Sequence, residues 1–233
     1  MKDLLKKLFL EYKIDFTDEK LSKLEHFYNI VIRENQKFNL TAIIGENDFA
    51  IKHFLDCALI CNLIDSGKSV CDVGAGAGFP SIVLKILRDD LNITMVDSLQ
   101  KRVNFLNNTI LELGLKNIKT FHERVEDFAL HSREKFDVCV ARAVAGLNTL
   151  CEYCLPLTKV GGKFIAMKGS GYETELDVAK NAILTLGGKL ETIKKIYIKE
   201  IDGTRANIVV DKVERCPSKY PRGKNLPKVK PIV

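Results

Sequence analysis

The spacing of hydrophobic residues differs between two parts of the chain. In the first 60 residues, apolar positions recur every three or four residues, as at Leu4, Leu8 and Tyr12 and again from Leu21 to Val31, which predicts helices. After Gly67, short apolar runs alternate with helical stretches. The runs are residues 69–73, 93–97, 118–122, 136–141 and 163–167. This alternation is typical of buried parallel strands with helical crossovers, so we expect an α/β fold with a mostly parallel sheet behind an N-terminal helical extension.

Two further elements are predicted with defined ends. A five-residue apolar face predicts a helix after the second strand, and Gly114 follows as its C-terminal cap. The residues of this face are Leu99, Val103, Leu106, Ile110 and Leu113. Further on, strand residues near 196–198 and 208–210 flank an Asp202-Gly203 turn. We therefore expect a C-terminal antiparallel hairpin at one edge of the parallel sheet.

Charge is unevenly distributed. The chain of 233 residues has 36 Lys and Arg against 30 Asp and Glu, and 46% of its residues are hydrophobic, which excludes a disordered chain. The whole excess of six lies in residues 215–233, a segment without acids that also holds four of the six prolines. Proline fixes φ and removes a backbone donor, so no helix or central strand is expected there. We expect a helical extension over 1–62, a core over 63–214 and a basic tail over 215–233.

The remaining composition excludes two other classes of protein. No run of about 18 apolar residues predicts a membrane span, and the N-terminal stretch is too short and too interrupted by lysine for a signal peptide. Seven cysteines, an odd number, do not form a secreted disulfide framework. Cys151 and Cys154 form one isolated C-x-x-C pair in an apolar helical pattern, so no metal is expected. These observations predict a cytoplasmic protein.

The most specific motif is a glycine loop between the first strand and a helix. Asp72 and Val73 are followed by glycines at 74, 76 and 78, which let backbone N–H groups approach a ligand. A dinucleotide-binding fingerprint would need glycine at position 79, where this chain has Phe79. The loop resembles instead the first motif of class I S-adenosylmethionine-dependent methyltransferases, which implies cofactor contacts at Gly74, Gly76, Gly78 and Phe79. A simple turn without a ligand is the alternative.

Two more sites favour a nucleoside cofactor. Asp97 ends the second strand and Ser98 follows, where a carboxylate in such a sheet faces a bound ribose. NAD sites use a carboxylate at the same place, so Asp97 does not distinguish NAD from S-adenosylmethionine. After the third strand, Val125 and Glu126 occupy the place where methyltransferases of this fold contact adenine. The alternative is that Glu126 and Asp127 are acids that complement a helix dipole.

The region after the fourth strand contains no recognisable residue that would deprotonate a methyl acceptor. Residues 141–145 read Ala-Arg-Ala-Val-Ala, without the acidic or Asn-Pro-Pro-aromatic motif of many amino-methylating enzymes. No Pro-Cys nucleophile motif is recognisable either. An aromatic ring nitrogen has a free lone pair and needs no deprotonation, so catalysis on such an acceptor could rest on placement and electrostatics.

Taken in order, these stretches resemble the small-subunit ribosomal RNA guanine-N7 methyltransferase family, also called glucose-inhibited division protein B. The matching stretches are 39–41, 53–56, 72–80, 97–98, 101–102, 124–126, 142–145, 168–169 and 220–222. The resemblance implies a cytoplasmic enzyme that uses S-adenosylmethionine to methylate N7 of a guanine in small-subunit ribosomal RNA, free or in the assembled subunit. Cys57 and Ser81 depart from the usual serine and glycine.

By motif position, the resemblance implies site roles for single residues. It implies cofactor contacts at Gly74, Phe79, Val125, Glu126 and Arg142, and catalytic-site roles for Arg142, Asn39 and Lys168. Arg142 could serve the cofactor or the RNA, or form a buried ion pair. Asn39 and Thr41 could cap the next element or line the cofactor entrance. His53 is expected to be a structural hydrogen-bonding group, with Asp56 as its partner.

Basic residues predict an RNA surface. Several lie at carboxyl ends of strands or in the tail, where they could follow phosphates. The candidates are Lys101, Arg102, Arg124, Arg222, Lys224 and Lys228. Arg222 comes first because its planar guanidinium can grip a phosphate with two hydrogen bonds. Ordinary surface charge is the alternative, and no DNA partner is expected.

Three other functions compete with RNA methylation. A class I methyltransferase for a small molecule or a protein would explain the glycine loop but leave the basic tail without a role. An NAD-binding oxidoreductase is favoured by the position of Asp97 and opposed by Phe79. A nucleotide-binding regulatory module without catalysis is the third.

Overall fold

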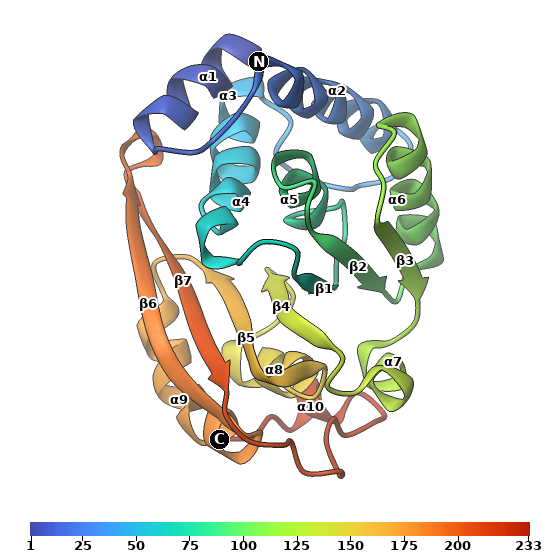
Figure 1. Ribbon diagram of the computed structural model, residues 1–233, viewed down its shortest axis with the longest axis vertical. Helices are drawn as coiled ribbons and strands as arrows, with labels where there is room; N and C mark the ends of the chain where they lie inside the picture. Colours follow the sequence, from blue (N-terminus) through green and yellow to red (C-terminus); the bar gives the residue numbers. More distant parts are fainter. The chain divides into compact units, whose positions relative to one another are not determined.

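A computed structural model describes residues 1–233. Its seven strands form one mixed sheet in the order β3-β2-β1-β4-β5-β7-β6 (Figure 1). The chain forms two compact units: Met1–Lys68 with Ala75–His122, and Ser69–Gly74 with Glu123–Val233. The predicted division at residues 62 and 214 does not coincide with these units and stays a prediction. No helix is both long and apolar enough to span a membrane.

The first unit is mainly helical. Its helices are α1 (Lys2–Glu11), α2 (Asp18–Asn35), α3 (Glu46–Phe49), α4 (Asp56–Ala58), α5 (Ser81–Leu87) and α6 (Gln100–Glu112), with a π-helical segment at Ala50–Leu55 and a 3-10 turn at Cys61–Leu63. Its strands β2 (Asn92–Asp97) and β3 (Ile118–His122) pair in parallel. Helix α2 begins where the Thr17 hydroxyl accepts a hydrogen bond from the Lys20 N–H at 3.3 Å.

The predicted helix after the second strand is present as α6. Gly114 has a φ of +62°, the left-handed conformation expected of a C-terminal cap. Leu99, predicted to lie on the apolar face, is the N-cap instead and is 43% exposed. Phe105, which the apolar pattern did not include, is buried on this helix. The helix was thus predicted correctly, with an error at its first residue.

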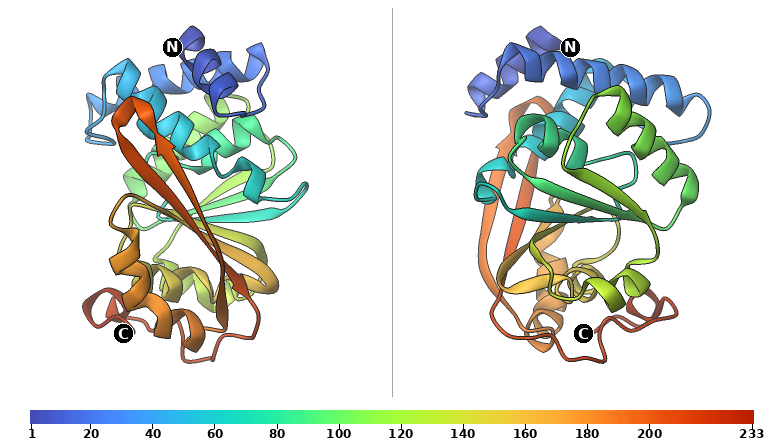
Figure 2. Two further views of the ribbon diagram at one scale, coloured as in Figure 1. Left: turned by 90° about the vertical axis from the view of Figure 1, so that its left-hand side faces the viewer. Right: turned by 45° about the vertical axis from the view of Figure 1, so that its right-hand side comes forward.

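The second unit contains five strands. They are β1 (Ser69–Val73), β4 (Phe136–Arg142), β5 (Thr158–Lys168), β6 (Gly188–Ile198) and β7 (Gly203–Lys212). Strands β1, β4 and β5 are parallel, whereas β7 pairs antiparallel with both β5 and β6. Asp202 adopts φ +44° in the predicted turn. The hairpin is therefore confirmed, but it is longer than predicted and strongly twisted (Figure 2).

The helices of the second unit include one that the sequence did not predict. They are α7 (Val125–Ser132), α8 (Leu147–Cys154), α9 (Tyr172–Thr185) and α10 (Leu226–Val229), with a 3-10 turn at Lys199–Ile201. Helix α10 lies in the tail, where we expected no helix, so that expectation was wrong. Pro227 lies in its first turn, where backbone N–H groups make no hydrogen bond within the helix, so proline is tolerated there.

The tail is held by side chains from the rest of the second unit. Arg133 donates hydrogen bonds to the carbonyls of Cys216, Pro217 and Tyr220 at 2.6, 2.9 and 2.5 Å. The Thr149 hydroxyl donates to the Pro227 carbonyl at 2.9 Å. The tail is therefore an ordered part of this unit.

All seven cysteines are free thiols with buried side chains. Cys151 and Cys154, the C-x-x-C pair, are fully buried on α8. Burial raises the pKa of the Cys151 thiol well above its ordinary value. These cysteines therefore belong to the apolar core of the unit.

Candidate functional site

The glycine loop depends on backbone conformations that favour glycine. Gly74, Gly76 and Gly78 have φ values of +75°, +57° and +89°. A Cβ at Gly78 would lie 2.6 Å from Cγ1 of Ile82, and a Cβ at Gly74 would lie 2.7 Å from Cγ2 of Val144. The loop therefore combines left-handed turns with close packing.

In the first unit, Asp97 holds this loop at the end of β2. Its Oδ2 accepts a hydrogen bond from the Gly76 N–H, and its Oδ1 accepts one from the Leu99 N–H, both at 2.9 Å. The carboxylate is 4% exposed, and Nη1 of Arg102 lies 3.6 Å from Oδ2. Each carboxylate oxygen has two acceptor positions, so both can still accept a ligand hydroxyl. Ser98, the neighbouring predicted contact, is exposed.

Phe79 belongs to an aromatic cluster of the first unit. Its ring stacks on His53 with centroids 4.3 Å apart and an interplanar angle of 9°. The rings of Phe27 and Phe49 lie 5.3 and 5.7 Å away. The ring of Phe79 thus anchors the glycine loop to the N-terminal helices, which leaves its backbone as the group for the predicted cofactor contact.

The segment after α2 is organised by an amide that the sequence reasoning missed. The Asn35 Oδ1 accepts from the Leu40 and Thr41 N–H groups at 2.7 and 3.0 Å. The Thr41 hydroxyl accepts from the Ile43 N–H at 3.1 Å and lies 2.9 Å from Nε2 of His53. Thr41 is therefore a local hydrogen-bonding group. Its contact with His53 agrees with the structural hydrogen-bonding role expected for that histidine. Asn39 is exposed.

In the second unit, the candidate adenine contacts begin helix α7. Val125 is its first residue, Arg124 is its exposed N-cap, and Glu126 lies in its first turn with 7% exposure. Burial and then the negative charge of Glu126 raise the pKa of Tyr153 to about 12. Asp127, by contrast, is exposed. The two acids thus differ: Asp127 is a solvated acid at a helix N-terminus, and Glu126 is a buried one.

Lys168 connects three segments of the second unit. Its Nζ donates to the Ala145 carbonyl at 2.8 Å and to Oε2 of Glu175 at 2.7 Å. The same carboxylate oxygen accepts from the Leu147 N–H at 2.8 Å. Lys168 therefore holds the segment after β4 in place. Arg142, half-buried, ends β4, and the next residue, Ala143, has a φ of +55°.

Of the predicted RNA-binding residues, Arg102 lies beside Asp97, and the other five fall into two groups. Lys101, Arg124, Lys224 and Lys228 are exposed. Arg222 is engaged instead: its Nε and Nη2 donate to the two carboxylate oxygens of Glu152 at 2.8 and 2.6 Å, and Nη2 also donates to the Lys230 carbonyl at 2.9 Å. Glu152 is fully buried. Glu152 was missed, although an acid inside an apolar helical run is itself a signal of a buried ion pair.

Comparisons with known proteins agree with the predicted family. A family model described as rRNA small subunit methyltransferase G matches residues 20–204. The chain belongs to this family. A relative from Clostridium botulinum (strain ATCC 19397 / Type A), named Ribosomal RNA small subunit methyltransferase G, is 44% identical over 226 residues, 95% of each chain. One of the same name from Desulforamulus reducens is 44% identical over 232 residues, 98% of this chain and 97% of its own.

A solved structure supports the fold. Precorrin-6y C5,15-methyltransferase from Geobacter metallireducens has a TM-score of 0.53 and 14% identity, over 77% of this chain and 96% of its own. The predicted family and class I fold are confirmed, and the chain is an S-adenosylmethionine-dependent methyltransferase of the rRNA small subunit methyltransferase G family. Family membership disfavours the oxidoreductase and the regulatory module. The roles of single site residues stay predictions.

Proposed function

We propose that the protein transfers a methyl group from S-adenosylmethionine to N7 of a guanine in small-subunit ribosomal RNA, in the cytoplasm. The observation that carries this proposal is the match to relatives named Ribosomal RNA small subunit methyltransferase G along nearly their whole length. Guanine N7 has a lone pair available for attack, and residues 141–145 carry no acid that would serve as a base. Direct in-line transfer is the mechanism that needs the fewest groups.

The first unit supplies a carboxylate that fits the cofactor's ribose. Asp97 is held by two N–H groups and keeps one acceptor position on each oxygen. We assign these positions to the two ribose hydroxyls, with Ser98 beside them. The backbone of Gly76, Gly78 and Phe79 is assigned to the amino-acid part of the cofactor. When bound, the cofactor supplies an electrophilic methyl group on a positively charged sulfur.

The second unit supplies the remaining proposed cofactor contacts. Val125 is assigned to the adenine ring, Glu126 to its amino edge, and Gly74 to the loop that surrounds the amino-acid part. Arg142 is permanently charged, and we assign it to orient either the cofactor or the guanine. Lys168 acts through the Ala145 carbonyl that it holds, so it is a positioning residue. Asn39, exposed in the first unit, is assigned to the RNA.

RNA binding is assigned to the exposed basic residues. Lys101 and Arg124, together with Lys224 and Lys228 of the tail, are free to follow phosphates. Arg102 lies beside Asp97, where its charge steadies that carboxylate. Arg222 is assigned to hold the tail, because a phosphate would have to displace the buried Glu152 carboxylate.

Labelled S-adenosylmethionine tests this function directly. The protein is incubated with small-subunit RNA, either protein-free or assembled into subunits, and the labelled nucleotide is mapped. Label on N7 of one guanine is expected. Label on another atom would refute the N7 assignment, and label only in a small molecule or protein would refute RNA as the substrate.

A further inference from the structure

One carboxylate of the second unit joins the start of α9 to the segment after β4. Glu175 lies in the first turn of α9, and its Oε2 accepts hydrogen bonds from the Leu147 N–H at 2.8 Å and from Nζ of Lys168 at 2.7 Å. The same Nζ donates to the Ala145 carbonyl at 2.8 Å. Residues 145 and 147 are therefore both held, one through Lys168 and one by Glu175 directly. The proposed function gives Glu175 no role of its own.

The segment after β4 has a conformation that needs support. Ala143 has a φ of +55°, a left-handed conformation that is unfavourable for a residue with a Cβ. Gly146 is the N-cap of α8 and offers no side chain to cap the helix. The N–H of Leu147, the first residue of α8, therefore has no acceptor within the helix, and Glu175 supplies one. Such a backbone persists only where the surrounding structure holds it.

The same segment packs directly on the glycine loop. A Cβ at Gly74 would lie 2.7 Å from Cγ2 of Val144 and 3.2 Å from its Cγ1, so Val144 lies against the bare backbone of Gly74. Strands β1 and β4 are adjacent and parallel, with Asp72 opposite Val140. This register brings Gly74 and Arg142, both proposed cofactor contacts, to the same edge of the sheet. A shift of the segment after β4 would therefore disturb both of them.

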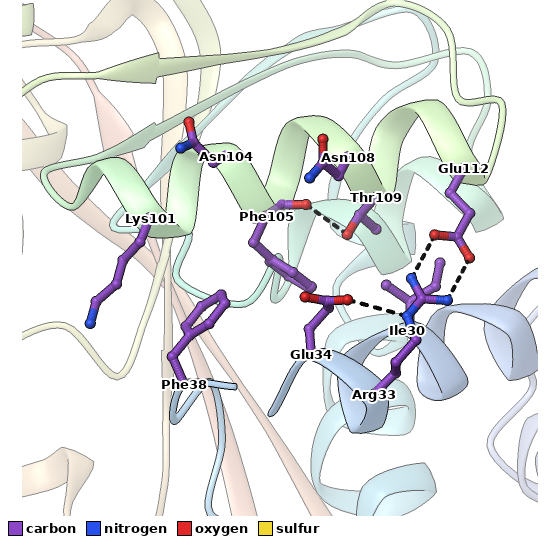
Figure 3. A pocket seen from close by; sticks show the side chains of 10 residues that line it. All are labelled: Ile30, Arg33, Glu34, Phe38, Lys101, Asn104, Phe105, Asn108, Thr109 and Glu112. Carbon is purple, nitrogen blue, oxygen red and sulfur yellow. Dashed lines mark hydrogen bonds and ion pairs between the residues drawn. The ribbon is translucent and has the colours of Figure 1, made fainter. Parts of the chain in front are cut away.

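Another ion pair between two elements lacks these backbone contacts. In the first unit, Arg33 of α2 donates to both carboxylate oxygens of Glu112 on α6, at 3.1 and 2.7 Å, beside an open groove of about 480 Å³ (Figure 3). The further hydrogen bonds of these two side chains are also to side chains. Lys168 and Glu175 instead each bind a backbone group of the segment after β4. Their pair therefore fixes the backbone as well as joining two elements.

We propose that Glu175 is a positioning residue for methyl transfer. Through its two hydrogen bonds it holds the segment after β4, keeps Val144 packed on Gly74 and so maintains the shape of the glycine loop that S-adenosylmethionine requires. Glu175 itself contacts neither the cofactor nor the RNA in this proposal. The inference rests on the proposed cofactor roles of Gly74 and Arg142, and it deepens the proposed function of that site.

Calorimetric binding of S-adenosylmethionine in the absence of RNA tests this role. Glu175→Gln keeps the size of the side chain and one carbonyl acceptor, but removes the negative charge that faces Lys168. This variant is expected to bind the cofactor about threefold more weakly than the wild type. Glu175→Ala loses both hydrogen bonds and is expected to bind it about tenfold more weakly. The glutamine variant keeps the test decisive if the alanine variant does not fold.

Two comparisons separate positioning from a general effect on stability. Glu173→Ala is the matched control, because Glu173 lies in the same first turn but accepts from the Tyr172 hydroxyl at 2.6 Å instead of from the segment after β4. It removes the same charge from the helix N-terminus, and cofactor affinity should stay as in the wild type. In a double-mutant cycle, the losses from Glu175→Gln and Lys168→Met should not add, because both changes release the same segment.

Hydrogen exchange of the Leu147 amide reports the contact itself and should be faster in Glu175→Ala than in the wild type or in Glu173→Ala. Faster exchange together with wild-type cofactor affinity would overturn the inference, because the segment would then be free without any effect on the site. Equal losses of affinity in Glu175→Ala and Glu173→Ala would also overturn it, as would fully additive losses in the cycle. Failure of the proposed function is seen separately, because the wild type would then bind the cofactor but label no RNA.

Discussion

Arg222 of the tail and Glu152 of α8 form a two-pronged ion pair, with N–O distances of 2.8 and 2.6 Å. The Arg222 backbone N–H also donates to the same carboxylate at 2.8 Å. Because Glu152 is fully buried, this pair fixes the path of the basic segment.

Arg222→Ala is therefore expected to destabilise the protein. Removing one partner of a buried pair leaves an uncompensated charge, and such losses cost about 3 kcal/mol. Urea unfolding measures the change in the free energy of unfolding. Lys224→Ala, an exposed residue two positions on, should stay within about 0.5 kcal/mol of wild type. Normal stability with weakened RNA binding in Arg222→Ala would restore Arg222 to the RNA surface.

The exposed tail lysines should act on RNA affinity instead. Lys224→Ala and Lys228→Ala are each expected to reduce the slope of log affinity against log salt by about 0.7–0.9, without a change in stability. Filter binding of small-subunit RNA at several salt concentrations gives the slope. Identical slopes in wild type and in the double variant would remove the tail from the RNA interface. Point variants are preferable to deletion of residues 215–233, because deletion would also expose Glu152.

Asp97→Ala should weaken S-adenosylmethionine binding by at least tenfold. The variant loses the proposed ribose acceptor and leaves the Gly76 and Leu99 N–H groups without their carboxylate. Isothermal calorimetry measures the affinity. Asp65→Ala, a change at an exposed acid of the same unit, is the control. Wild-type affinity in Asp97→Ala would exclude Asp97 from the cofactor site.

Comparison of Gly78→Ala with Gly67→Ala separates the cost of backbone strain from the cost of overpacking. At Gly78 a Cβ meets Ile82 at 2.6 Å and φ is +89°, whereas at Gly67 φ is +71° with nothing within 4 Å of a Cβ. Gly67→Ala should therefore cost about 1 kcal/mol from backbone strain alone, and Gly78→Ala a further 1–3 kcal/mol from overpacking. Thermal unfolding measures both. Equal costs would show that the contact with Ile82 relaxes freely.

Asp137 should make stability depend on acid pH. Burial opposes its ionisation, but hydrogen bonds from Ser69 and the Lys159 ammonium outweigh that effect and lower its pKa to about 2. A lowered folded-state pKa stabilises the protein above the unfolded value near 4, and this stabilisation is lost as pH falls toward 2. Asp137→Asn should therefore cost about 1–2 kcal/mol at pH 7 and much less near pH 2. A pH-independent difference between variant and wild type would contradict this.

The sheet was the most predictable part of the molecule. The strands at 69–73 and 118–122 were predicted with their observed ends, because both are short apolar runs bounded by turn residues. Helix α9 and the first half of β6 were not predicted. β6 carries three lysines and one glutamate and is largely exposed, so its apolar signal is weak.

The candidate site was predictable by residue type rather than by contact. Asp97 and the three glycines stand out in the sequence because their spacing has few structural alternatives. Lys168 and Arg222 were harder to assign. The residue type alone does not show whether a basic side chain near a strand end or in a tail is solvated or paired with a carboxylate. The sequence does not show which acid each of them meets: Glu175 lies 7 residues from Lys168, and Glu152 lies 70 residues from Arg222.

The burial of all seven cysteines has a practical consequence for experiments on this enzyme. Thiolates are the reactive species, and burial raises the pKa of Cys61 to about 12, which keeps that thiol protonated. The folded protein should therefore react only very slowly with maleimide reagents. A single Lys228→Cys or Asn108→Cys change would then carry a fluorophore at one chosen position, without removal of any natural cysteine.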